Sequence, residues 1–342
     1  MIETVKGNAD EFLELLKGNV AYVLVIGNTK TAEISGITVA GANPELIKYT
    51  PPADAELLYY GKCLSIDGIP VTPDGKPTPA LISYTALRLT GIPIFVVDSG
   101  LMIKPKLPYI SLNAPVGENI NERRAMDIER VKEVFERGKL FGKQISKLVD
   151  VLIIGESIPA GTTTAAAVLK ALGLKPAVSS SMPNNPIDLK LKVIENAVKR
   201  VESENPFEVV SAVGDPVMVG VASIAIGSEK PVVLAGGTQM VAIANLISRI
   251  GKCKAIIATT SYIVKDKNAD LSISPYPVVA ADPMLGKSKY SGLRAYDEGF
   301  VKEGVGIGGL TLLAYTRDIK PDEFLKEVER DYENIVLKGM SF

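Results

Sequence analysis

The chain contains no histidine and no tryptophan, and its 342 residues include only two cysteines, Cys63 and Cys253. Without histidine it cannot form a Ser-His-Asp triad, a histidine-activated cysteine or an imidazole metal site. Two cysteines far apart in the sequence are also too few for a tetrahedral zinc site. We therefore expect no metal site, and we assign any acid-base chemistry to aspartate, glutamate, lysine or tyrosine.

The charges of the chain are balanced, with 38 lysine and arginine residues against 39 aspartate and glutamate residues. This balance leaves no positive excess to bind a nucleic acid or an anionic membrane, so small-molecule ligands are favoured. The first ten residues lack the basic patch and apolar run of a secretory signal, and we expect a cytoplasmic protein. The longest uncharged run, 231–248, contains Gly236, Gly237 and Gln239, which suit a strand, a turn and a buried helix better than a membrane span.

Short β-branched runs recur along the chain, and each is continuously hydrophobic rather than alternating. They cover residues 21–26, 94–97, 151–154, 231–234 and 255–258. Such runs are typical of strands buried on both faces of a parallel sheet. Stretches of helical length accompany them at residues 79–90, 121–148, 162–172, 187–202, 216–226 and 238–250. The predicted fold class is therefore α/β, a doubly wound, mostly parallel sheet with flanking helices.

Both ends of the chain have the pattern of amphipathic helices, at residues 10–16 and 321–336. No strand pattern separates them from the sheet. We expect them to form a small helical subdomain of residues 1–18 plus 318–342, beside an α/β domain of residues 19–317.

Ligands of a doubly wound sheet bind at the carboxyl ends of its strands, where loops run into helix N-termini. The loops at 155–164, 235–239 and 303–309 are expected to lie there. In the first, Gly155 and Gly161 allow close approach of the backbone, and Thr162 and Thr163 add hydroxyl groups at the helix start. These features favour a phosphate ligand. The segment is not a Walker loop, because the lysine is missing and the glycine spacing differs, and an ordinary capped helix is its alternative interpretation.

Several motifs together resemble those of the nicotinate-nucleotide-dimethylbenzimidazole phosphoribosyltransferases. The resemblance covers most of residues 80 to 316, and it implies the same fold and activity. It would make this chain a divergent member of that family. The matching segments are Gly155-Glu156 with Gly161-Thr-Thr-Thr-Ala-Ala-Ala, Val96-Val97-Asp98-Ser99-Gly100, Asn113 to Met126, Ala212-Val213-Gly214-Asp215, Val232 to Gly236, and Lys302-Glu303-Gly304-Val305-Gly306-Ile307-Gly308.

The resemblance also implies roles for individual residues. Glu303 corresponds to the catalytic base, which removes the proton of a benzimidazole nitrogen, and Glu156 to a second acid; a solvated loop residue is the alternative for Glu303. The residues implied in binding the ribose and its phosphate are Gly155, Gly161, Thr162, Thr163, Lys190, Gly214, Asp215 and Gly304, with Lys192 left open beside Lys190. No cofactor is implied. The resemblance further implies a homodimer, for which the small-residue helix at 217–226 offers a contact.

The first third of the chain departs from the family pattern, because the proline-rich loop and the Asp-His-Gly element are missing. Ile26-Gly27-Asn28-Thr29 stands where the latter is expected. This leaves the acceptor of the ribosyl group open, and Tyr60 and Tyr84 are candidates for an aromatic wall around the base. Two alternatives to the benzimidazole transferase therefore remain. One is a hydrolase or a transferase with another acceptor, and the other is a non-catalytic nucleotide-binding protein.

Overall fold

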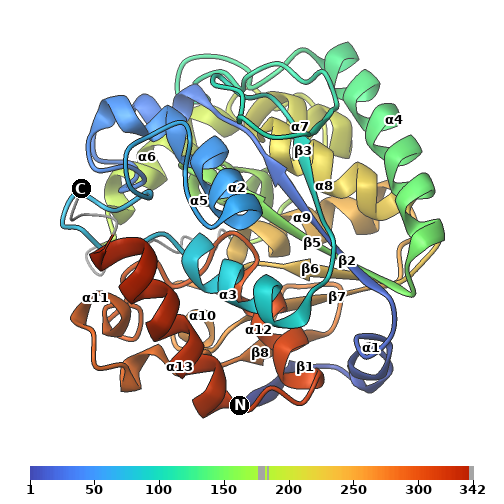
Figure 1. Cartoon of the computed structure of the whole chain (residues 1–342). Coiled ribbons are helices and arrows are strands. Elements are labelled where there is room, and N and C mark those ends of the chain that lie inside the picture. The colour runs from blue at the N-terminus through green and yellow to red at the C-terminus, as the bar shows by residue number, and fades with distance from the viewer. Residues whose placement is uncertain (176–181, 183–184, 339–342) are drawn as a thin grey trace.

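A computed structural model describes residues 1–175, 182 and 185–338, which build an eight-stranded sheet flanked by helices (Figure 1). All neighbouring strands are parallel except the first, which runs antiparallel to its neighbour at the sheet edge. Across the sheet the strands lie in the order β1 (Ile2–Lys6), β8 (Val278–Ala281), β7 (Ala255–Thr260), β6 (Val232–Ala235), β5 (Val151–Ser157), β2 (Val20–Ile26), β3 (Ile94–Asp98) and β4 (Ile110–Ser111).

The central strands are hydrophobic along their whole length because both faces of the sheet are covered. Every residue of β2 and β5 is buried. Successive side chains of a strand point to opposite faces, so the side chains of each of these strands contribute to two separate hydrophobic cores. The predicted fold class, a doubly wound and mostly parallel sheet with flanking helices, is confirmed.

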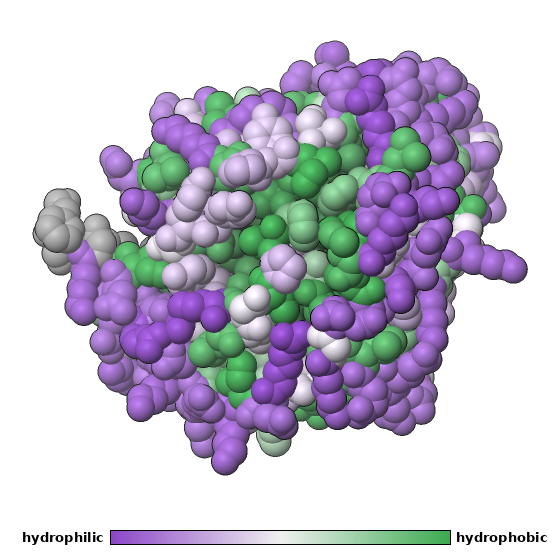
Figure 2. Space-filling model, turned by 45° about the vertical axis from the view of Figure 1, so that its right-hand side comes forward, coloured by the Kyte–Doolittle hydropathy of each residue, from purple (hydrophilic) through white to green (hydrophobic). Residues whose placement is uncertain are grey.

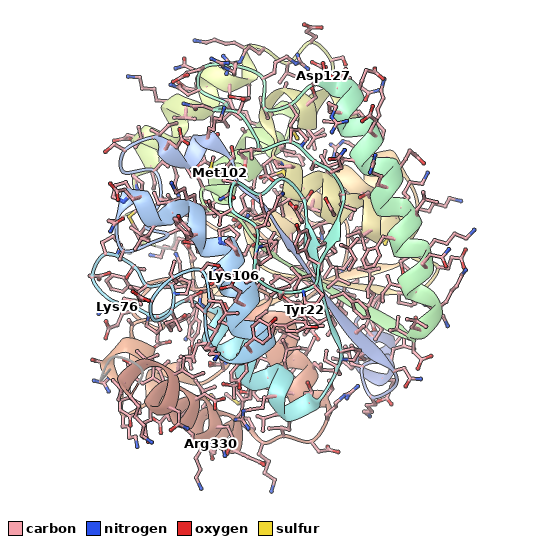
Figure 3. All side chains as sticks on the ribbon, turned by 45° about the horizontal axis from the view of Figure 1, so that its top comes forward. Tyr22, Lys76, Met102, Lys106, Asp127 and Arg330 are labelled. Carbon is pink, nitrogen blue, oxygen red and sulfur yellow. The ribbon has the colours of Figure 1, made fainter. Side chains whose placement is uncertain are left out.

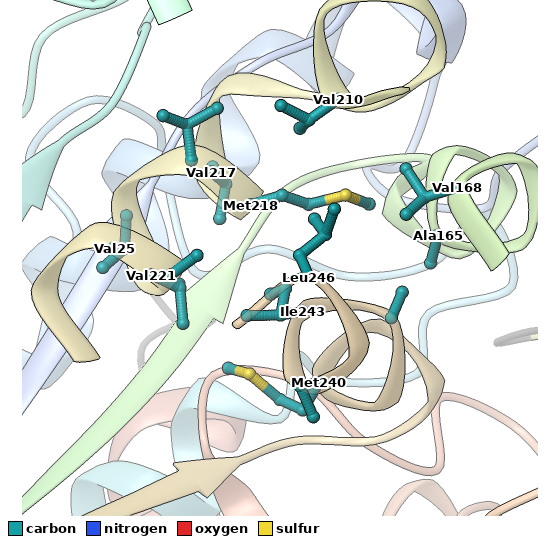
Figure 4. Packing of buried hydrophobic residues seen from close by; sticks show 14 of the residues in the cluster. Val25, Ala165, Val168, Val210, Val217, Met218, Val221, Met240, Ile243 and Leu246 are labelled. Atoms are coloured by element: carbon teal, nitrogen blue, oxygen red, sulfur yellow. The ribbon is translucent and has the colours of Figure 1, made fainter. Parts of the chain in front are cut away.

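One face of the sheet is covered by helices from the middle of the chain, whose buried side chains form a single core with Val23, Val25 and Ile154. These helices are α4 (Ile128–Ile145), α5 (Gly161–Ala171), α6 (Ile187–Val198), α7 (Pro206–Val213), α8 (Pro216–Gly227) and α9 (Thr238–Ile250). Met218 of α8 extends toward Val168 of α5 and lies beside the α9 side chains (Figure 4).

The opposite face is covered by helices from the two ends of the sequence, which pack against Tyr22, Leu24 and Ile153. They are α1 (Asp10–Leu15), α2 (Thr50–Tyr60), α3 (Ala80–Thr90), α12 (Ile307–Thr316) and α13 (Pro321–Asp331). Shorter helical segments are α10 (Ser261–Val264), α11 (Ser291–Arg294), four 3-10 turns at Lys30–Glu33, Pro44–Tyr49, Ser146–Leu148 and Leu285–Lys287, and a π-helical turn at Tyr332–Leu337. No helix in the described ranges is long and apolar enough to cross a membrane.

Helix α8 is a core element rather than a surface for a second subunit. Residues Val217 to Ala225 are all buried, and the helix packs between α4 and α9. Its uniformly apolar sequence reflects contacts on all sides within one chain. The expected subunit contact through residues 217–226 is therefore wrong.

The N-terminus contains a strand, β1, that the sequence pattern does not predict. Residues 2–6 are largely exposed, yet they pair antiparallel with β8 and close the edge of the sheet. The guanidinium group of Arg317 donates to the carbonyl oxygens of Leu16 and Gly18, at 3.3 and 2.8 Å, and so joins the two ends of the chain. The buried residues of α1 and α13 belong to the same core as the sheet. The division into residues 19–317 and a terminal subdomain stays a prediction.

The sheet has a topological switch point between β2 and β5. From β2 the chain crosses through α2 and α3 on one face to reach β3, whereas from β5 it crosses through helices on the other face to reach β6. The two connections therefore diverge at the carboxyl ends of β2 and β5 and leave a crevice there. Such crevices are where doubly wound proteins bind their ligands.

The close packing of α4 against α8 depends on glycine. A Cβ atom on Gly142 would lie 2.2 Å from the carbonyl oxygen of Ile224, so Gly142→Ala has to push the two helices apart. We expect this variant to lose about 1–3 kcal/mol of unfolding free energy, measured by urea denaturation. Gly251→Ala is the matched control, because its added methyl group would lie 3.5 Å from Ile226, in ordinary contact. Equal stability of the two variants would contradict this packing.

Candidate functional site

A cleft opens at the switch point, at the carboxyl ends of β5 and β2. It is lined by residues 37–41, residues 70–72 and 76–79, residues 156–162, residues 301 and 303–305, and the single residues Thr50, Asp54, Met182, Lys190 and Gln239. Segments from the first half of the chain thus face segments from the second half. The structure brings the predicted site residues Glu156, Glu303, Gly161, Thr162, Lys190 and Gly304 together in this cleft.

Several helices begin beside the cleft, among them α2, which starts at the lining residue Thr50. The residues that line the cleft also include Pro79 before α3, Gly161 at the start of α5, Gln239 in the first turn of α9, and Val305 before α12. The unpaired N–H groups and the dipole of a helix N-terminus favour a negatively charged ligand. The cleft therefore suits an anion although the chain as a whole carries a formal net charge of -1.

Glu156 is buried in β5, where its backbone lies opposite Val25 of β2. Its carboxylate accepts a hydrogen bond from the side-chain amide of Gln239, at 3.2 Å. Burial, followed by repulsion from Asp215 and Glu303, raises the pKa of Glu156 to about 8. At neutral pH this side chain is therefore mostly a neutral acid, able to donate as well as accept a hydrogen bond.

Glu303 lies on the turn that precedes α12 and remains partly exposed to the cleft. One carboxylate oxygen accepts the backbone N–H groups of Gly304 and Gly308, at 3.1 and 3.2 Å, and the other accepts the Thr260 N–H and the Thr259 hydroxyl, at 2.9 and 3.3 Å. Burial raises the pKa of Glu303 to about 7, and these hydrogen bonds work against the rise. A carboxylate with a pKa near neutrality is suited to take up a proton and release it again.

The turn that carries Glu303 has an unusual backbone. Val301, Lys302 and Val305 all have positive φ angles, of 59, 56 and 53°. For a β-branched residue this conformation is unfavourable, and it persists only where surrounding contacts impose it. The carbonyl oxygen of Val305 accepts the hydroxyls of Tyr22 and Ser83, at 2.7 and 2.8 Å, and its N–H donates to the Glu156 carbonyl oxygen.

Tyr22 lies inside the molecule, between the strands and the helices of one face (Figure 3). A Cβ atom on Gly155 would come within 2.2 Å of its hydroxyl oxygen. Gly155 does not line the cleft. Because it has no side chain, it leaves room for the Tyr22 hydroxyl, which holds the turn of Glu303 by its hydrogen bond to Val305.

Lys190 contacts the threonine-rich start of α5. Its ammonium group donates to the Thr162 hydroxyl, at 3.3 Å, and the side chain is buried. Burial, followed by repulsion from Lys302, lowers the pKa of Lys190 to about 8. Lys192 is exposed and does not line the cleft, so the geometry distinguishes the two lysines that the sequence left open. Thr163 is buried in α5 away from the cleft, and its hydroxyl has no hydrogen-bond partner among the described residues.

Gly214 and Asp215 lie behind the cleft wall rather than on it. The Asp215 carboxylate caps α8 by accepting from the Met218 N–H at 2.9 Å, and it also accepts from the Thr164 hydroxyl at 2.6 Å. Burial raises the pKa of Asp215 to about 6. Asp215 does not line the cleft, but its charge contributes to the raised pKa of Glu156.

Tyr60 and Tyr84 are also outside the cleft lining. Thr50 at the N-terminus of α2 lines the cleft, whereas Tyr60 ends the same helix about 15 Å away and donates to the carbonyl oxygen of Lys106. Tyr84 packs against Gly61, close to that far end. The cleft lining contributed by the described residues contains no aromatic side chain.

The sequence did not identify Asp54 as a site residue, and it included Ser157 and Gln239 only as members of the loops 155–164 and 235–239. Asp54 is buried in α2 and accepts from the hydroxyls of Thr78 and Ser157, both at 2.7 Å; burial raises its pKa to about 7. No motif marks it, since a lone aspartate in a helix is ordinarily a surface residue. Among the described residues, no group of three or more histidine, cysteine, aspartate or glutamate side chains is arranged to hold a metal ion.

Comparison with known proteins identifies the family. A family model described as phosphoribosyltransferase matches residues 81–257, which is more than half of the chain. The chain belongs to this phosphoribosyltransferase family. It also belongs to the UPF0284 family: a UPF0284 protein of Archaeoglobus fulgidus is 75% identical over 336 residues, covering 98% of this chain and 99% of the relative. A UPF0284 protein of Sulfolobus acidocaldarius is 46% identical, covering 94% and 96%.

Solved structures share the fold at low sequence identity. CobT from Thermus thermophilus superimposes with a TM-score of 0.62 at 18% identity, covering 95% of this chain and 92% of that one. A nicotinate-nucleotide-dimethylbenzimidazole phosphoribosyltransferase structure from the same organism gives 0.61 at 16% identity, covering 96% and 92%. The similarity in fold reaches well beyond residues 81–257 and covers nearly all of this chain.

The raised pKa of Glu156 makes stability depend on pH. An unfolded glutamate releases its proton near pH 4.5, whereas folded Glu156 keeps it to about pH 8, so the folded state loses stability relative to the unfolded state as the pH rises between these values. We expect Glu156→Gln to unfold with more free energy than wild type at pH 8.5, by about 4–5 kcal/mol, and with nearly equal free energy near pH 4.5. The exposed Glu204→Gln is the control, and a pH-independent difference for Glu156→Gln would contradict the assignment.

Proposed function

We propose that this phosphoribosyltransferase moves ribose 5-phosphate from nicotinate mononucleotide to a benzimidazole-like base, giving an α-linked ribotide and nicotinate for the lower ligand of a cobamide. The observation that carries the proposal is the presence in one cleft of an anion-binding helix start with Lys190 and of the carboxylate Glu303. The structurally similar proteins, one of which is a nicotinate-nucleotide-dimethylbenzimidazole phosphoribosyltransferase, support the choice of substrates.

The start of α5 is suited to the 5-phosphate of the donor. Gly161 begins the helix, the Thr162 hydroxyl lies at its first turn, and Lys190 reaches that hydroxyl. Backbone N–H groups and one ammonium group together meet the needs of a phosphate dianion. We assign the ribose to the neighbouring floor of the cleft, where neutral Glu156 can donate a hydrogen bond to a hydroxyl group without repelling the phosphate.

We assign to Glu303 the removal of the N–H proton from the attacking base. The base nitrogen forms a bond to C1′ as the bond from C1′ to nicotinate breaks, and the bonding electrons return to the pyridine nitrogen of nicotinate. The N–H proton of the base passes to the Glu303 carboxylate. Because nicotinate leaves as a neutral ring nitrogen it needs no protonation, so the protein's tasks are orientation and removal of one proton. Attack opposite the leaving group inverts C1′ and gives the α linkage.

Two alternatives remain: hydrolysis or transfer to another acceptor, and ligand binding without turnover. Incubation with nicotinate mononucleotide and a panel of bases, followed by mass analysis, separates the first. Thermal stabilisation by nicotinate mononucleotide with no product would indicate the second. Two acids with raised pKa values in one cleft favour an enzyme, because a binding protein gains nothing from them.

A homodimer in the cytoplasm remains part of the proposal. Helix α8 is not available for the subunit contact. Hydrophobic residues gather in the middle of one face of the molecule, within a hydrophilic border, which is the arrangement that a subunit contact requires (Figure 2).

Removing the proposed base tests the mechanism. We expect Glu303→Gln to lower kcat for transfer by roughly 10²- to 10⁴-fold, because the base nitrogen then has no group to take its proton. Binding of nicotinate mononucleotide, measured by calorimetry, should stay within about threefold of wild type. Full transfer activity in this variant would eliminate Glu303 as the base, and the exposed Glu204→Gln should behave as wild type.

The two lysines of α6 give a matched test of the phosphate site. We expect Lys190→Met to raise KM for nicotinate mononucleotide by about 10- to 100-fold, the value of one charge-assisted hydrogen bond to phosphate. Lys192→Met removes the same charge two residues away, from an exposed position, and should leave KM unchanged. Steady-state kinetics over a range of nicotinate mononucleotide concentrations measures both. Equal effects in the two variants would contradict a specific contact by Lys190.

A further inference from the structure

The turn that carries Glu303 is held at its beginning by strand β7. Thr260, at the carboxyl end of this strand, donates its hydroxyl to the carbonyl oxygen of Lys302, at 2.7 Å, and its backbone N–H to the Glu303 carboxylate, at 2.9 Å. Thr260 is fully buried. One residue of the sheet therefore fixes both the backbone before Glu303 and one oxygen of its carboxylate.

The end of the turn is held by two other hydroxyl groups, from Tyr22 of β2 and Ser83 of α3. Both donate to the carbonyl oxygen of Val305, at 2.7 and 2.8 Å, and both residues are fully buried. A carbonyl oxygen has two lone pairs, so this acceptor is saturated. Cβ atoms on Gly155 and Gly306 would lie only 2.2 and 2.6 Å from the Tyr22 hydroxyl oxygen. Two glycines thus leave the space that this hydroxyl needs to reach the turn.

The backbone of the turn explains why both of its ends have to be held. Lys302 and Val305, whose carbonyl groups accept these hydroxyls, lie in the left-handed region, with φ angles of 56 and 53°. Residues with a side chain rarely adopt this conformation, and it persists only where surrounding contacts impose it. Without the hydroxyl groups the turn is free to relax to negative φ angles. Such a change would displace Glu303, which lies between the two residues in the chain.

The three hydroxyl groups act at a distance from the ligand. Tyr22, Ser83 and Thr260 do not line the cleft, so they have no direct contact with a substrate. Helices α5 and α6, which carry the phosphate side of the cleft, pack on the face of the sheet opposite to Tyr22 and Val305. The hydroxyl groups therefore affect the reaction through the position of Glu303, and binding of the donor phosphate should not depend on them.

We propose that Tyr22, Ser83 and Thr260 are positioning residues, which hold the Glu303 carboxylate where it can remove the proton of the attacking base. The inference rests on the proposed transferase function, since it takes Glu303 as the base. A displacement of about 1 Å at a reacting group can lower a rate by about 10²-fold. Loss of these hydrogen bonds should therefore lower kcat and leave KM for nicotinate mononucleotide unchanged.

Tyr22→Phe removes one hydroxyl group and keeps the aromatic ring. We expect it to lower kcat for transfer by about 10- to 100-fold, with KM for nicotinate mononucleotide within about threefold of wild type. Thr260→Val should have an effect of the same order, and Thr260→Ser, which keeps the hydroxyl, should restore activity. Tyr262→Phe is the matched control, because Tyr262 is buried and its hydroxyl accepts from the Leu285 N–H at 2.9 Å. Loss of that hydrogen bond should lower Tm but not kcat.

A double-mutant comparison separates positioning from a general effect on the fold. Glu303→Gln has no carboxylate left to position. Tyr22→Phe should therefore lower the residual kcat of Glu303→Gln by less than about twofold, because residues that act as a unit are not additive. An equal loss in the wild-type and Glu303→Gln backgrounds would overturn the proposal, and so would an unchanged kcat in Tyr22→Phe. Ser83→Ala removes the other hydroxyl bound to Val305 and gives the same comparison if Tyr22→Phe does not fold.

Hydrogen exchange separates this inference from the transferase proposal. If wild type forms no ribotide from any base, the transferase proposal fails. The N–H groups of Gly304, Val305 and Gly308 are hydrogen-bonded to Glu303 or to the backbone of Glu156. They should exchange about 10-fold faster in Tyr22→Phe than in wild type, whatever the activity. Unchanged exchange would show that the hydroxyl does not hold the turn, and it would reject the inference.

Discussion

The hydroxyl group of Tyr22, buried between the sheet and the helices of one face, holds the turn that carries Glu303. It donates to the carbonyl oxygen of Val305, which also accepts the Ser83 hydroxyl, while the N–H of Val305 donates to the backbone of Glu156. Three segments far apart in the sequence thus meet at the backbone of one residue, Val305. These contacts offset the unfavourable positive φ angles of the turn, and they explain how a strained loop keeps a carboxylate in a fixed position.

The same arrangement concentrates acid groups where water is scarce. Glu156, Glu303 and Asp54 all lie close enough to Tyr22 to contribute, after burial, to the raised pKa of its hydroxyl. Each of these acids has a raised pKa of its own, chiefly because of burial. The folded protein is less stable at neutral pH than it would be with neutral residues there. In exchange, the cleft holds groups that can change protonation state near pH 7, which is the property that general acid-base chemistry requires.

The fold shows how a phosphate site and a proton acceptor reach one ligand without lying near each other in the sequence. Parallel strands align their carboxyl ends at one edge of the sheet, and the switch between β2 and β5 sends the following helices to opposite faces. The phosphate side of the cleft then comes from one face and the side bearing Glu303 from the other. Solved phosphoribosyltransferase structures that share only 16–18% of residues keep this overall fold, because the arrangement depends on sheet order and on helix packing more than on particular side chains.

The sequence by itself determined the parallel sheet, since continuous β-branched runs are a local signal of strands covered on both faces, and it singled out the segments of Glu156 and Glu303 through their glycine contexts. Only the tertiary structure decided which of those residues face the cleft. In the structure Lys190 lines the cleft and Lys192 does not, and Tyr60 and Tyr84 lie outside it. Helix α8 is buried. Asp54 in the cleft lining and the edge strand β1 were not predicted from the sequence. The physical reason is that a strand covered on both faces produces a run of consecutive hydrophobic residues, which is a local pattern. The direction of a side chain in a helix, and the meeting of segments a hundred or more residues apart, depend on how the whole sheet and its helices pack.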